Sequence, residues 1–162
     1  RNPNSMQQQY RIDHRIVSEQ EAKQEGVYSI YWLDDNGHTQ HIHMLDGDQL
    51  YKIIYCHQQP PFDTLIQQHR NQHPGVDCEC WSTPEHTAQG PQFRATLYDG
   101  RGRPLGKALR QEDNEGRLLW EIEYTRDDQF ITHTRYHYTG DRLTKVQELD
   151  IDGNQISEME LQ

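Results

Sequence analysis

Long hydrophobic runs are missing from this sequence of 162 residues, and hydrophobic residues make up only 32% of it. No run approaches the roughly 18 apolar residues of a membrane-spanning helix, so the sequence predicts no membrane span. Globular domains usually hold about 45–50% apolar residues when glycine is counted, and a thick core between two sheets needs that share. We therefore expect a thin core, with one sheet face covered and the other largely exposed to water.

Basic residues are also in short supply, with 16 Lys and Arg against 26 Asp and Glu and a formal net charge of -10. The isoelectric point is about 5.4. An acidic surface repels phosphate groups, so we expect no nucleic-acid partner, and it offers no polybasic segment to a membrane surface. The same charge is compatible with docking onto a basic protein partner.

Cysteine is scarce, and three residues, an odd number, argue against a disulfide scaffold. The common catalytic motifs are absent as well: there is no glycine-rich phosphate loop, no nucleophile elbow and no His-Glu-x-x-His helix. We therefore predict no enzymatic activity. No signal-peptide pattern is visible, so we expect a cytoplasmic protein, although the start at Arg1 rather than Met leaves export open.

What the sequence does contain is a regular alternation of turn signals and strand-forming stretches in its second half. Tyr, Trp, Ile, Val and Thr are frequent between the turns, which is typical of a β-meander. Nine Tyr, three Trp and three Phe argue against disorder. The turn signals are Asp99-Gly100, Asn114-Glu115-Gly116, Asp127-Asp128, Gly140-Asp141 and Asp152-Gly153. The six predicted strands span 93–98, 104–110, 117–124, 129–138, 142–149 and 155–161.

The first half predicts three further strands, at 28–33, 38–45 and 50–55. Turn signals at 34–37 and at Asp46-Gly47 separate them. The stretch from 74 to 91 then holds three Pro and two Gly, so we expect a long ordered loop or crossover there.

Two helices are predicted between these segments. Ser18 followed by Glu21 fits a capping box before a short helix at 19–25, and Gly26 suits its C-terminal cap. A second helix is predicted at 62–72, because its apolar residues follow helical spacing and Pro74-Gly75 would end it. We expect this helix to lay its apolar stripe on the sheet.

These patterns together predict a mainly β fold, with an α+β fold as the alternative. We expect an antiparallel β-meander of about eight or nine strands in a twisted, open sheet, since polar terminal strands do not favour a closed barrel. The chain is predicted to form a single domain, 1–162. Its parts are a lead-in at 1–17, a first β segment at 27–56, a helix and Cys/Pro loop at 57–91, and a repeat-like meander at 92–162.

Several turns carry a shared motif, mainly between 93 and 153. Residues 98–105, Tyr-Asp-Gly-Arg-Gly-Arg-Pro-Leu, resemble the Tyr-Asp-x-x-Gly-Arg-x-Leu core of YD (Rhs-type) repeats. Residues 136–143 are similar but one residue shorter in the turn, 150–153 match the Asp-x-x-Gly half, and 31–37 are a looser echo. The rhythm resembles MORN-type strand-turn repeats more loosely. YD repeats build shells or extended sheets without an active site, so the resemblance implies a scaffold or interaction surface.

A cluster of His and Cys residues between Cys56 and Cys80 is the candidate metal site. His69 and His73 lie four apart on a predicted helix, and Cys78-x-Cys80 follows, so these four side chains could enclose a tetrahedral zinc. The usual Cys-x2-Cys knuckle is absent. The alternative is that His69 is a partly buried helix residue, Cys56 a core residue, and the other two cysteines loop thiols. We expect no cofactor, with zinc as the alternative.

Two histidine pairs and four aromatic residues are further candidates. His41 and His43 point the same way on one predicted strand, so they could bind a metal with a third ligand from a neighbouring strand or could simply face solvent. The same alternatives hold for His133 and His137. Tyr and Trp on a firm sheet can anchor a partner, or they can form the core that aliphatic residues do not supply. The aromatic candidates are Tyr31, Tyr51, Tyr55 and Trp81.

The sequence therefore predicts a non-enzymatic interaction or scaffold domain that presents an acidic β-sheet surface to a protein partner. A bacterial immunity or antitoxin-type protein would fit this description. The second hypothesis is a zinc-stapled or metal-dependent domain that uses the cluster from Cys56 to Cys80. The third is a small-ligand carrier with a pocket under the helix at 62–72, lined by Phe62, Ile66 and strand aromatics. The oligomeric state stays open.

Overall fold

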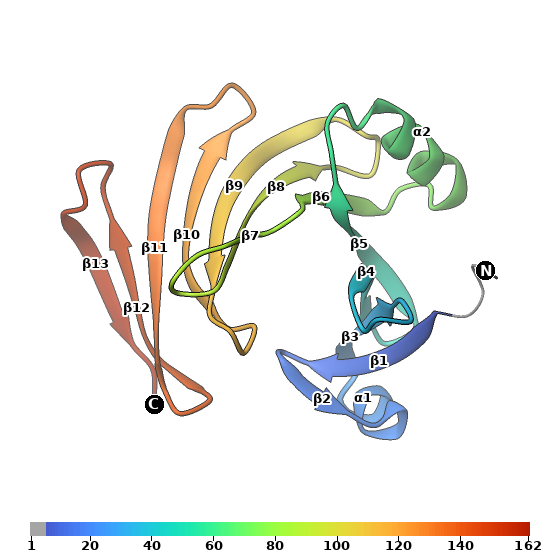
Figure 1. Cartoon of the computed structure of the whole chain (residues 1–162), viewed down its shortest axis with the longest axis horizontal. Coiled ribbons are helices and arrows are strands. Elements are labelled where there is room, and N and C mark those ends of the chain that lie inside the picture. Colours follow the sequence, from blue (N-terminus) through green and yellow to red (C-terminus); the bar gives the residue numbers. More distant parts are fainter. Residues whose placement is uncertain (1–5) are drawn as a thin grey trace. The chain divides into compact units, whose positions relative to one another are not determined.

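The computed structural model describes residues 6–162 and shows a mainly β protein, with 58% of residues in strands and 11% in helices. Two helices and one open sheet of 13 strands are present in this part of the chain (Figure 1). The strand order is β13-β12-β11-β10-β9-β8-β6-β5-β4-β3-β1-β2, and β7 pairs with β8 beside this path. The predicted mainly β, open sheet is confirmed, whereas the expected eight or nine strands are too few.

The chain divides into two compact units. The first holds the chain up to Thr83 together with Leu97–Pro104, and the second holds Pro84–Thr96 together with Leu105–Gln162. The first unit contains β1 (Gln7–Ile12), β2 (Arg15–Val17), α1 (Glu19–Glu25), β3 (Val27–Leu33), β4 (Thr39–Asp46), β5 (Gln49–Gln58), α2 (Asp63–Gln72) and β6 (Asp77–Ser82). The remaining strands are β7 (Glu85–His86), β8 (Pro91–Tyr98), β9 (Pro104–Glu112), β10 (Leu118–Thr125), β11 (Phe130–Thr139), β12 (Arg142–Leu149) and β13 (Gln155–Glu160).

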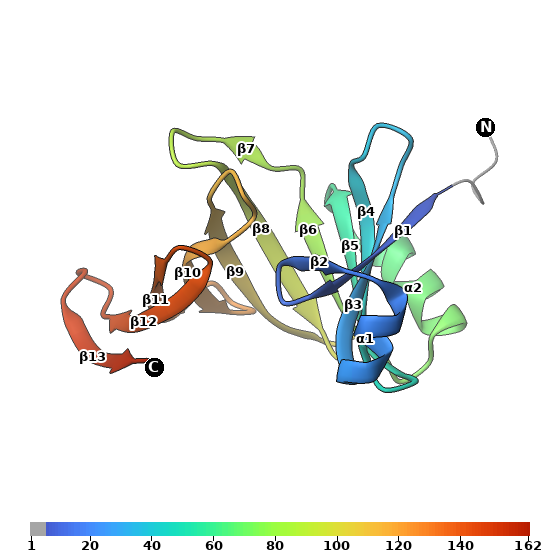
Figure 2. The same cartoon turned by 90° about the horizontal axis from the view of Figure 1, so that it is seen from below.

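Both predicted helices are confirmed. Ser18 is the N-cap of α1, and its side chain accepts a hydrogen bond from the Glu21 backbone N–H at 3.1 Å, while Gly26 closes the helix with a φ of 94°. The helix lies beside the β1–β2 hairpin (Figure 2). α2 connects β5 to β6 and buries Ile66 and His69. These strands are parallel, and a parallel pair needs such a crossover connection.

The predicted lead-in at 1–17 is wrong from Gln7 onward. β1 pairs with β2 and with β3, antiparallel in both cases, and so forms part of the sheet. Its sequence begins with three Gln and shows no apolar alternation, so the strand depends on its neighbours and not on its own pattern. Residues 1–5 of the predicted lead-in lie outside the described residues.

The predicted Cys/Pro loop within 57–91 is also wrong, because it contains β6 and β7. β6 pairs in parallel with β5, so the mainly antiparallel sheet includes a parallel pair. Cys78, Glu79 and Cys80 are all buried in this strand, with at most 4% of each residue exposed. A buried strand is normally a continuous run of apolar residues in the sequence. The acidic residues next to the cysteines interrupt such a run here, so the sequence pattern did not predict β6.

Four hairpin turns share one design, an Asp followed three residues later by a Gly. In each turn the Asp side chain accepts hydrogen bonds from the backbone N–H groups two and four residues ahead, at 2.9 to 3.0 Å. The Gly has a φ between 78° and 86°, a left-handed conformation that glycine adopts without steric cost. The turns begin at Asp34, Asp99, Asp113 and Asp150 and end with Gly37, Gly102, Gly116 and Gly153.

Candidate functional site

Strands β3 to β6 in the first unit carry a different cluster on each face. One face packs Ile42, Ile54 and Cys56 together, with Tyr31, Met44 and Trp81 against them. On the other face Ile66 of α2 packs on Cys78 and Cys80, and Tyr55, Phe62, Leu65 and Tyr98 complete the cluster. These strands therefore carry apolar clusters on both faces, and α2 packs on one of them.

An open pocket of about 620 Å³ lies on the helix side of β3, β4 and β5, next to the end of α2. We call it the imidazole pocket. The strand register brings its residues together, because Trp32 lies opposite His41 and His41 lies opposite Tyr55. Its lining includes Trp32, His41, His43, Tyr55, Gln72 and His73.

The rings around this pocket form a continuous chain of contacts. The ring centroids of His41 and His43 are 5.9 Å apart, those of His43 and His73 are 6.3 Å apart, and those of His73 and His69 are 5.6 Å apart. Trp32 contacts both strand histidines, at 6.2 Å and 5.5 Å. Helix α2 thus adds a third and a fourth imidazole to the pair that β4 presents.

His69 differs from the other three imidazoles because both of its ring nitrogens have partners. Nε2 lies 2.7 Å from the carbonyl oxygen of Val76, so Nε2 carries the proton and donates it. Nδ1 then accepts the hydroxyl proton of Tyr55 at 2.6 Å. His69 is only 2% exposed. Its role is to fasten α2 to β5, and it is not available to a ligand.

The pocket histidines are held in the neutral form. Burial and then the neighbouring charges of His41 and His73 lower the pKa of His43 to about 4. Burial also lowers the pKa of His41 and of His73. A neutral imidazole has one N–H donor and one free lone pair, so each ring can donate and accept.

The residues predicted for a zinc site are not gathered into one. His69 lies in α2 and His73 is its C-cap, with the two ring centroids 5.6 Å apart, but Cys78 and Cys80 are each 1% exposed and belong to the core under the helix. Burial raises the pKa of both thiols to about 12, which favours the protonated form that binds metal poorly. Cys56 lies in the cluster on the opposite face. Within residues 6–162 no three His, Cys, Asp or Glu side chains are placed to hold a metal ion.

The four aromatic candidates do not form one surface. Tyr31 and Trp81 pack on the Ile42 cluster, and the Trp81 indole donates to Glu79 at 3.3 Å. Tyr55 lies on the helix side and Tyr51 is 39% exposed. The aromatics thus supply part of the core, while Trp32, which the sequence did not single out, lines the pocket. The sequence could have pointed to Trp32, because the strand that contains it is joined by a short turn to the strand that carries His41 and His43.

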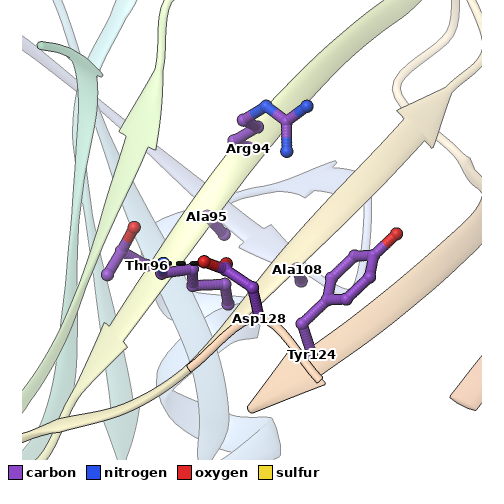
Figure 3. Close-up of a pocket in the computed structure, with 7 residues that line it drawn as sticks. Arg94, Ala95, Thr96, Ala108, Tyr124 and Asp128 are labelled. Atoms are coloured by element: carbon purple, nitrogen blue, oxygen red, sulfur yellow. Dashed lines mark hydrogen bonds and ion pairs between the residues drawn. The ribbon is translucent and has the colours of Figure 1, made fainter. Parts of the chain in front are cut away.

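A second, smaller pocket of about 310 Å³ lies in the second unit (Figure 3). Ala95 of β8 and Ala108 of β9 leave room there, and Tyr124 and Asp128 flank it. The Lys107 ammonium and the Asp128 carboxylate are 2.9 Å apart at its edge. Two of the polar side chains that line this smaller pocket are thus already paired with each other, so it is the weaker candidate.

Two carboxylates lie side by side on β10, also in the second unit. Glu121 is 8% exposed and accepts a hydrogen bond from the Arg110 guanidinium. A hydrogen bond with Glu121, followed by burial and the charge of Glu121, raises the pKa of Glu123. Neither carboxylate lines one of the two pockets described above. We interpret the group as a structural pair.

In comparisons with known proteins, no family model, no curated protein and no solved structure matches the chain. A search for helices with the length and apolar character of a membrane span finds none within residues 6–162.

Proposed function

We propose that this chain is a non-enzymatic interaction domain that binds a basic protein partner through the acidic strands at the β13 end of its sheet. The observation that carries the proposal is the exposure of β13, where all six residues from Gln155 to Glu160 are exposed. Such a strand offers a row of backbone N–H and C=O groups to a further strand, which is a common mode of peptide recognition.

The side chains of β13 support binding as well as the backbone does. Ile156 is 65% exposed and Met159 is 57% exposed, and Ile151 in the preceding turn is 72% exposed. Exposed apolar side chains that are spread singly over a surface need no explanation, but several on one hairpin mark an interaction site. They would supply the apolar contacts of the interface.

The charge around β13 selects the kind of partner. Residues 141–162 contain six Asp and Glu against one Arg and one Lys. The Lys145 ammonium lies 3.8 Å from the Glu158 carboxylate, so this lysine is paired with one of the six acids. The excess negative charge favours a partner with Lys and Arg on its surface, as in an immunity or antitoxin-type pair.

The test compares two edge strands of the same chain. We expect the double variant Ile156→Lys, Met159→Lys to lose a partner that the wild-type chain retains from cells of its source, because the substitution adds repulsive charge and removes apolar contact. The variant Ile16→Lys on β2 is the matched control, since Ile16 is 62% exposed at the other end of the strand order. Retention of the partner by the double variant, or binding that does not weaken in high salt, would contradict the proposal.

A further inference from the structure

The imidazole pocket has the features of a ligand site that is independent of β13. Its volume of about 620 Å³ falls within the roughly 300–1,000 Å³ typical of small-molecule sites. Its walls are the flat rings of Trp32 and Tyr55 and the side chain of Ile53, with the imidazoles of His41, His43 and His73 among them. Flat walls of this kind fit a planar apolar body.

The polar groups that line the pocket are the imidazoles of His41, His43 and His73, the indole of Trp32, the hydroxyl of Tyr55 and the amide of Gln72, and no carboxylate of residues 6–162 lines it. The hydrogen bonds of the described residues leave the ring nitrogens of His41, His43 and His73 without a protein partner, in contrast to those of His69. The indole N–H of Trp32 is buried and has no acceptor among residues 6–162. The pocket therefore offers several N–H donors to a ligand.

The electrostatics favour a negatively charged ligand. Burial and repulsion between neighbouring rings keep these imidazoles neutral. A bound anion would favour their protonated form, because it would pair with the positive charge and so offset both effects. The titratable groups that line the pocket are His41, His43, Tyr55 and His73, and those that pack beside it are His69 of α2, Cys78 and Cys80 of β6, and Tyr98 of β8. None of them supplies a negative charge at neutral pH, since burial raises the pKa of both thiols and of Tyr55.

We propose that the imidazole pocket binds an organic anion with a flat aromatic body, such as an aromatic carboxylate, and takes up a proton as it does so. The aromatic body would lie against Trp32 and Tyr55, and the carboxylate would accept hydrogen bonds from the imidazoles of His43 and His73. The Trp32 N–H is buried, so a carboxylate oxygen reaches it only when neighbouring side chains move.

The experiment is calorimetric titration of the full chain with 2-naphthoate and with its neutral analogue 2-naphthamide. The naphthoate is expected to bind more tightly as the pH falls from 7.5 to 5.5, by up to about tenfold per pH unit for each proton bound. Titration in buffers with different heats of ionisation should show the proton uptake directly. The amide is expected to bind at least about tenfold more weakly, since it carries no charge to pair with an imidazolium.

Variants of single histidines localise the effect. His73→Gln at the end of α2 and His43→Gln on β4 should each weaken naphthoate binding by about fivefold or more and reduce its pH dependence. His133→Gln is the matched control, because His133 also contacts a tryptophan ring, at 5.9 Å from Trp120, and also has a pKa lowered by burial. It should change the affinity less than about twofold.

Four results would overturn the proposal: no binding of naphthoate, binding that is independent of pH, equal affinity for the amide, or an equal loss in His133→Gln. Zn²⁺ alone is the last arm of the experiment. Tight binding of Zn²⁺ that His73→Gln abolishes, without any binding of naphthoate, would make the pocket a metal site instead and would also overturn it.

Discussion

The Asp and Gly residues of the hairpin turns have the clearest individual roles in this protein. The Asp carboxylate satisfies two backbone N–H groups inside each turn, and the Gly takes a backbone conformation that other residues adopt only at a cost. Backbone hydrogen bonds from Arg103 and Arg101, together with the Arg103 side chain, lower the pKa of Asp99 despite its opposing desolvation. The fold favours the charged form of this turn carboxylate, whereas it favours the neutral form of the histidines in the imidazole pocket.

Gly116 isolates the backbone cost of such a turn. Its φ is 84°, and a methyl group added there would meet nothing within 4 Å. We expect Gly116→Ala to lower the free energy of unfolding by about 1–2 kcal/mol, from backbone strain alone. Chemical denaturation measures the change. Gly116→Asn is the control, because Asn tolerates the left-handed region better, so an equal loss in both variants would contradict this explanation.

The pocket histidines should make the protein sensitive to mild acid. The pKa of His43 is lowered from 6.5 to about 4, so the unfolded chain binds this proton first as the pH falls. Stability is thus fully present above about pH 6.5 and is lost progressively down to about pH 4, on the order of 1–2 kcal/mol after allowing for the partial exposure of the ring. Urea unfolding at pH 7.5 and pH 5 tests this. His43→Gln should flatten the dependence, and an unchanged slope would argue against it.

Individual strands show which elements a sequence pattern can reveal. β10 and β11 alternate clearly and were predicted within about one residue, and the capping box of α1 was read directly from Ser18 and Glu21. β1 and β6 were missed because their polar residues give no apolar period. Glu79 in β6 is 4% exposed and lies 3.1 Å from Lys52 of β5, so an ion pair from the neighbouring strand stabilises it there.

β10 offers a test of polar groups within a strand. The pKa of Glu123 is raised in the folded protein, so its contribution to stability is fully present below about pH 4.5 and is lost as the pH rises through the folded value. Glu123→Gln keeps the hydrogen bond to Glu121 without the second charge. We expect it to raise the free energy of unfolding at pH 7 by a few tenths of a kcal/mol to about 1 kcal/mol. Glu160→Gln on the exposed β13 should change it less, and a destabilised Glu123→Gln variant would contradict this explanation.

At the scale of the whole molecule, burial is uneven along the sheet. Ile53, Cys78 and Cys80 are each 1% exposed in β5 and β6, whereas all of β13 is exposed. Local stability follows the number of buried contacts, so the two ends of the strand order should open very differently.

Hydrogen exchange would measure this difference directly. We expect the backbone amides of β5 and β6 to exchange slowest and those of β13 fastest, by several orders of magnitude, because opening β13 breaks little apolar packing. The amides of β10 serve as the internal reference within the second unit. Protection of β13 equal to that of β5 would mean that something other than the described residues covers this strand.

The sequence by itself determined the mainly β fold, the hairpin turns and both helices, because turn chemistry and capping depend on residues close together in the chain. Only the tertiary structure decided the parallel pairing of β6 with β5, the burial of Cys78 and Cys80, and the meeting of His73 with His41 and His43. These features join residues far apart in sequence, and they follow from strand register and from the crossover of α2. The candidate site belongs to this second group, since no local pattern places an imidazole of α2 beside the pair on β4.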